Sequence, residues 1–92
     1  MTTRTPIQEV LRFLGIEDSA ILDELRREGL FEEDTVEPDT AEELRVAASL
    51  MRELGVNPAG VEVVLQLRRR LLVLEERTAE SLRRLLDEIE RG

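Results

Sequence analysis

The sequence contains no cysteine, histidine, lysine, tyrosine or tryptophan, and all thirteen of its basic residues are arginine. The absence of cysteine excludes a disulfide framework and a thiolate metal site. Without cysteine and histidine, the most common nucleophiles, general bases and transition-metal ligands are missing, so an enzyme is not expected. No apolar run approaches the ~20 residues of a membrane span, and no signal peptide is visible. We therefore expect a cytoplasmic protein with no cofactor and no membrane contact.

The 92 residues suffice for one compact domain, which glycine and proline divide into helices. The first helix is expected to start at Pro6, with Thr5 as N-cap and Gln8 completing a capping box. Gly15 is placed to end it. A second, short helix is expected after Asp18 or Ser19.

The second helix is expected to stop at Gly29, and the stretch "EEDTVEPD", residues 32–39, reads as a polar loop. A capping box of Thr40 and Glu43 then predicts the start of a third helix. The only two aromatic residues, Phe13 and Phe31, stand at helix-packing positions and are expected in the core.

A two-residue joint follows the third helix. Gly55 can adopt the left-handed conformation that ends a helix, Asn57 is a good N-cap, and Pro58 suits the first helical position. Val56 and Val61 stand at the positions of a hydrophobic staple, which fixes the angle at which the next helix begins. The sequence therefore predicts two helices set at a defined angle.

The last helix has no strong breaker from Pro58 to Arg91, although Thr78 could cap a restart. Unbroken, it would be about 50 Å long at 1.5 Å per residue, and a pattern of that length suggests a helix shared between chains. Its apolar positions keep three- and four-residue spacings, with a stutter around Thr78. We expect a homodimer with antiparallel final helices, whose contact residues are Leu67, Leu71, Leu74, Leu82, Leu85 and Ile89.

The stretch "ELGVNPAGVEVVLQLRRRL" resembles the segment that follows the helix-turn-helix of MerR-type regulators, and more closely that of their chaperone-modulator branch, the CbpM-type proteins. "FLGIEDSAILDELRREGLFEE" is similar to the helix-turn-helix itself, so the resemblance covers residues 6–77. It implies an all-α bacterial protein: a MerR-like winged helix-turn-helix with a third helix over 1–57, then a long dimerisation helix over 58–92. MerR-type proteins bind DNA, whereas the modulators bind the J-domain of a DnaJ-type co-chaperone and restrain its work with Hsp70.

Charge favours the second branch. The net charge is −8, and residues 17–43 alone hold twelve acidic residues against two arginines, or −10. These residues form the second helix and the wing-like loop, the elements that a winged helix-turn-helix presents to DNA. Phosphates require basic residues, and base edges require side chains such as arginine, of which the second helix has only Arg26 and Arg27. DNA binding, as a MerR-like regulator, is therefore the alternative rather than the leading function.

J-domains share a basic second helix, which normally docks on Hsp70. An acidic surface is complementary in charge to such a helix. We expect the modulator to mask it by competition, without chemistry. The stretch 32–34 could suggest a cation site, but it lacks the alternating oxygen ligands and glycine of a calcium loop, so no metal is expected. The expected partner-binding residues are Glu17, Asp18, Asp23, Glu24, Glu28, Glu32, Glu33 and Asp34.

Overall fold

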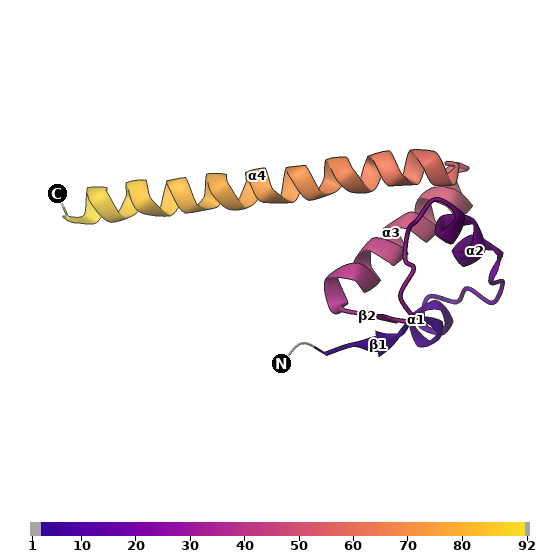
Figure 1. Ribbon diagram of the computed structural model, residues 1–92. Coiled ribbons are helices and arrows are strands. Elements are labelled where there is room, and N and C mark those ends of the chain that lie inside the picture. Colours follow the sequence, from indigo (N-terminus) through magenta and orange to yellow (C-terminus); the bar gives the residue numbers. More distant parts are fainter. Residues whose placement is uncertain (1–2, 92) are drawn as a thin grey trace.

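The computed structural model describes residues 3–91; residues 1, 2 and 92, which the ranges 1–57 and 58–92 include, lie outside the described residues. The chain is mostly helical. In chain order the elements are β1 (Thr5–Pro6), α1 (Ile7–Phe13), α2 (Ala20–Arg27), β2 (Thr35–Val36), α3 (Pro38–Leu54) and α4 (Pro58–Arg91). Figure 1 shows α1, α2 and the two strands gathered around α3, while α4 runs past them as one uninterrupted helix. The last helix is therefore continuous through Thr78.

The two strands form a small antiparallel ladder in which Thr5 pairs with Val36 and Pro6 with Thr35. The Ile7 amide extends it by donating to the Asp34 carbonyl at 2.8 Å. The predicted capping role of Thr5 is wrong, because Thr5 lies in β1 and α1 begins after Pro6 without a side-chain cap.

The third helix also begins earlier than the sequence predicts. Pro38 occupies its first turn and Glu37, in extended conformation, precedes it. Thr40 and Glu43 therefore lie inside the helix, and the predicted capping box between them is wrong. Proline fixes the backbone angle that a first helical turn needs and lacks only an amide that would be unpaired there, so it is a better start than Thr40.

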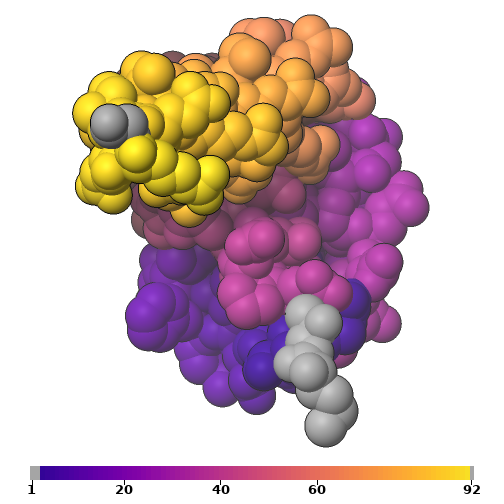
Figure 2. Space-filling model, turned by 90° about the vertical axis from the view of Figure 1, so that its left-hand side faces the viewer, coloured from indigo at the N-terminus to yellow at the C-terminus, as the bar shows by residue number. Residues whose placement is uncertain are grey.

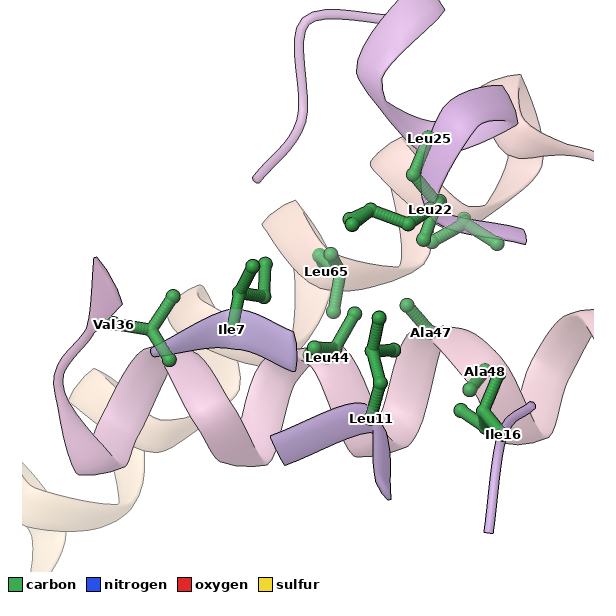
Figure 3. Packing of buried hydrophobic residues seen from close by; sticks show 11 residues of the cluster. Ile7, Leu11, Ile16, Leu22, Leu25, Val36, Leu44, Ala47, Ala48 and Leu65 are labelled. Carbon is green, nitrogen blue, oxygen red and sulfur yellow. The ribbon is translucent and has the colours of Figure 1, made fainter. Parts of the chain in front are cut away.

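The core is entirely apolar and centres on α3, as Figure 3 shows. Leu44, Ala47 and Ala48 of α3 are buried, and the small alanines let the neighbouring segments approach this helix closely. The last helix adds only Val61 and Leu65, both from its first turns. The buried residues are Ile7, Leu11, Ile16, Leu22, Leu25, Val36, Leu44, Ala47, Ala48, Val61 and Leu65.

The joint between α3 and α4 has the predicted local structure. Gly55 is left-handed, with φ of 67°, and ends α3. The Asn57 side chain caps α4 by accepting a hydrogen bond from the Gly60 amide at 2.8 Å. Figure 1 shows the two helices diverging from this elbow, with the last turns of α4 far from the other elements.

The projecting half of α4 makes the molecule elongated. Its principal extents are 59, 30 and 21 Å, and its radius of gyration is 17.3 Å. A compact chain of this length has a radius of gyration of about 12 Å. Every residue from 69 to 91 is exposed, so three short helices leave most of α4 uncovered.

Candidate interaction surfaces

Arg4 ties the N-terminal segment to the wing-like segment, residues 32–37. Its Nε donates to the Thr35 Oγ1 at 2.9 Å, and its terminal nitrogen donates to the Thr35 carbonyl at 2.7 Å. The guanidinium also forms ion pairs with Glu33 and, at 3.4 Å, with Glu37. Two carboxylates of the wing-like segment therefore face an arginine of the same chain.

Arg26 closes the same segment from the other side. Its Nε donates to the Phe31 carbonyl at 2.9 Å, and a terminal nitrogen donates to the Glu33 carbonyl at 3.3 Å. The same group lies 3.7 Å from the Asp34 carboxylate. Phe31 has a positive φ of 53°, a conformation that is rare outside glycine, so these bonds hold a turn the backbone does not favour. Arg26 is thus engaged within the fold.

All eight predicted partner-binding residues are exposed. They differ in what their side chains contact. Glu33 and Asp34 pair with arginines, and Asp18 accepts a hydrogen bond at 2.9 Å from the amide of Ala20, the first residue of α2. The N-cap position of α2 is Ser19, whose side chain makes no capping hydrogen bond. Within residues 3–91 the other five make no side-chain hydrogen bond or ion pair, and we name them the free acidic residues. They are Glu17, Asp23, Glu24, Glu28 and Glu32.

Two acidic residues near the start of α3 instead form ion pairs with arginines of α4. Glu43 pairs with Arg69 of α4 at 2.7 Å, and Glu42 lies 4.0 Å from Arg68. The hydrogen bond from Arg45 holds the pKa of Glu42 below its ordinary value, helped by the charges of Arg45 and Arg68. The same hydrogen bond raises the pKa of Arg45. These contacts tie α4 to α3 just beyond the last buried residue of α4.

The predicted dimerisation residues form one exposed row along α4, which we name the apolar stripe. Their side chains are 53–65 % exposed. Counting about 100° per residue, the stripe is turned about 120° away from Val61 and Leu65. The core contacts of α4 and the stripe thus lie on different sides of the helix. Figure 2, viewed from the C-terminal end, shows the last turns of α4 standing to one side of the other elements.

Covering the apolar stripe would release a substantial free energy of burial. Burying a whole leucine side chain is worth about 1.5–3 kcal/mol, so covering one that is half exposed recovers roughly 1 kcal/mol. The six side chains of two copies would together recover roughly 12 kcal/mol, which is of the same order as the 4–15 kcal/mol cost of association.

The prediction that Phe13 lies in the core is wrong, because its side chain is 90 % exposed. Helical periodicity could have revealed this: Phe13 follows the buried Leu11 by two residues and therefore points about 160° away from it. Sequence reasoning also missed further exposed apolar residues at the elbow and along α4. They are Leu54, Val63, Leu72, Val73 and Leu86.

The described residues contain no group of three or more acidic, histidine or cysteine side chains arranged to hold a metal ion. Across the same residues no polar or charged side chain is buried. No helix in this part of the chain is long and apolar enough to cross a membrane.

Comparison of the chain with protein-family models, with curated proteins and with solved structures finds no match. The resemblance to MerR-type regulators and chaperone modulators therefore stays a prediction from the sequence motifs.

Proposed function

We propose that this protein is a cytoplasmic chaperone modulator that binds the J-domain of a DnaJ-type co-chaperone. In this proposal α1, α2 and the β1–β2 ladder are a helix-turn-helix with a short wing, and the modulator is a homodimer through antiparallel α4 helices. The acidic surface docks on the basic second helix of the J-domain and masks it from Hsp70. Binding alone produces the effect, with no bond made or broken.

The observation that carries the proposal is the set of free acidic residues. Asp23 and Glu24 of α2, and Glu28 at its C-cap, face solvent without a neutralising partner among the described residues. The guanidinium of Arg26 is hydrogen-bonded to the Phe31 carbonyl, so Arg27 is the one exposed basic residue of α2. A surface of this sign attracts a basic helix, and it repels the phosphates of DNA.

Phe13 offers an exposed apolar side chain close in sequence to the first of these acidic residues. It lies four residues before Glu17, at the end of α1, and exposes nearly all of its ring. Interfaces usually draw most of their affinity from a few buried aromatic or arginine side chains, while surrounding charges guide association. Phe13 is therefore the anchor we assign to the docking surface, and the free acidic residues form its rim.

The test is a calorimetric titration of the full chain with a J-domain encoded in the same genome, at low and at moderate salt. We expect binding at micromolar concentration or tighter that weakens as salt rises. The triple variant Asp23→Arg, Glu24→Arg, Glu28→Arg should weaken binding at least tenfold.

The matched control reverses three acidic residues of α4, in the variant Glu76→Arg, Asp87→Arg, Glu90→Arg. It changes the net charge by the same amount, at exposed positions turned away from the apolar stripe. It should bind within about twofold of the unmodified chain at moderate salt, where distant charges are screened. Equal weakening by both variants would reject α2 as the docking surface. No binding to any J-domain, together with binding to duplex DNA, would establish the MerR-like regulator instead.

A further inference from the structure

The apolar stripe is symmetric about one residue. Leu74 and Leu82 lie four residues on either side of Thr78, and Leu71 and Leu85 lie seven residues away. Leu67 and Ile89 complete the pattern at eleven residues. Because α4 is a single continuous helix, this spacing along the chain is also a spacing in space, with Thr78 at its centre.

The same spacing has an eleven-residue period, which relates Leu67 to Thr78 and Thr78 to Ile89. Eleven residues in three turns give about 3.67 residues per turn, close to the 3.6 of an undistorted helix. A stripe with this period stays on one side of a nearly straight helix, whereas a heptad stripe requires left-handed supercoiling. The stutter around Thr78 is therefore part of a regular pattern.

We propose that two copies of the chain pair antiparallel along the stripe, with the two-fold axis passing at Thr78. This rests on the homodimer proposed above and specifies its register. Leu67 then faces Ile89 of the second copy, Leu71 faces Leu85, and Leu74 faces Leu82. Every apolar layer meets an apolar layer, and the two Thr78 side chains meet at the axis, where each also donates to its own Leu74 carbonyl at 2.9 Å.

One charge pair on the flank of the stripe favours the antiparallel direction. Arg70 lies beside the stripe on the same flank as Glu88. In the proposed register Arg70 lies within one turn of Glu88 of the second copy, and the two-fold axis repeats this pair. A parallel pair would instead place Arg70 beside Arg68 of the second copy, and like charges there repel.

The position of the acidic segment, residues 17–43, also favours the antiparallel arrangement. A parallel dimer brings two segments with a charge of −10 each, residues 17–43, to the same end of the helix pair. In the antiparallel register the two copies of Val61 lie about 51 Å apart along the axis, at 1.5 Å per residue. That separation is several times the screening length of about 8 Å at physiological salt. The dimer therefore presents two independent acidic surfaces, one at each end, and binds one J-domain per chain.

Because the chain contains no cysteine, single cysteines report the register directly. The full-length variants are Thr78→Cys, Leu67→Cys and Ile89→Cys, each at an exposed position. Under mild oxidation, Thr78→Cys should crosslink to itself. Leu67→Cys should not, because its two copies lie about 33 Å apart in this register and a disulfide needs Cα atoms within about 7 Å. A mixture of Leu67→Cys and Ile89→Cys chains should form the mixed crosslink.

Sedimentation equilibrium of the unmodified chain separates the two proposals. A monomer at the crosslinking concentration would overturn the homodimer and its register together. A dimer in which Leu67→Cys crosslinks to itself would be parallel, and a dimer without the Leu67–Ile89 crosslink would have another register. Either result would overturn this inference and leave the J-domain proposal in place.

Discussion

Replacing Gly60 with alanine provides a test in which helix propensity predicts a gain in stability and steric crowding predicts a loss. It is a helical glycine in the first turn of α4, where alanine normally stabilises a helix by about 1 kcal/mol. A Cβ atom at this position would lie 2.8 Å from Val56 Cγ1 and 3.2 Å from Asn57 Oδ1. Neither neighbour is a flexible chain end: Val56 is stiff at χ1, and Asn57 is the helix cap.

We expect Gly60→Ala to destabilise the protein. Forcing a methyl group into a packed elbow costs about 1–3 kcal/mol, and displacing the cap costs about 1 kcal/mol more. After the helix-propensity gain of about 1 kcal/mol, the net loss is about 1–3 kcal/mol. For a domain of this size that lowers the melting temperature by roughly 4–8 °C for each kcal/mol lost.

The assay is urea and thermal unfolding at matched protein concentration, followed by circular dichroism. Val56→Ala removes the closest clashing atom, so the cost of Gly60→Ala should shrink in the Val56→Ala background by more than the ~0.5 kcal/mol limit of additivity. A Gly60→Ala chain that is more stable than the unmodified chain, by the amount that helix propensity alone gives, would refute the steric argument.

Four further predictions concern the core, the cap, the charge pair and the docking anchor. Leu44→Ala, at a fully buried position of α3, should lower the free energy of unfolding by about 2–5 kcal/mol in urea titrations. Asn57→Ala should lower the free energy of unfolding by about 1 kcal/mol in the same measurement, and Asn57→Asp should keep most of the stability that the cap provides. The hydrogen bond from Arg45 lowers the pKa of Glu42 in the folded chain. The ionised Glu42 therefore stabilises the fold at pH values above the ordinary pKa of a carboxyl group, and this stabilisation is lost as the pH falls through the lowered pKa. The stability difference between Glu42→Gln and the unmodified chain should therefore vanish in acid, and a difference that persists there would contradict this assignment. Phe13→Ala should leave the melting temperature unchanged and weaken J-domain binding about tenfold in calorimetry, whereas unchanged affinity would remove Phe13 from the docking surface.

The features that follow from the sequence alone are those fixed by neighbouring residues. Gly55 ends a helix and Asn57 caps the next because the backbone conformation and the cap involve only residues a few positions apart. The alignment of the apolar side chains along α4 is equally local, since a fixed rotation per residue decides which side chains share a side of the helix. The excess of acidic residues in 17–43 needs no structure at all.

Tertiary structure decided the features that depend on residues distant in the chain. Thr5 lies in a strand rather than a cap because it pairs with Val36, thirty-one residues later. Arg4 and Arg26 neutralise Glu33 and Asp34 through contacts across the wing-like segment, and these contacts determine which acidic residues are left free. Only the first turns of α4 contribute to the core, because α3 and α4 diverge from the joint between them. The unpaired stripe and the free acidic residues thus result from non-local packing, which local sequence patterns do not specify.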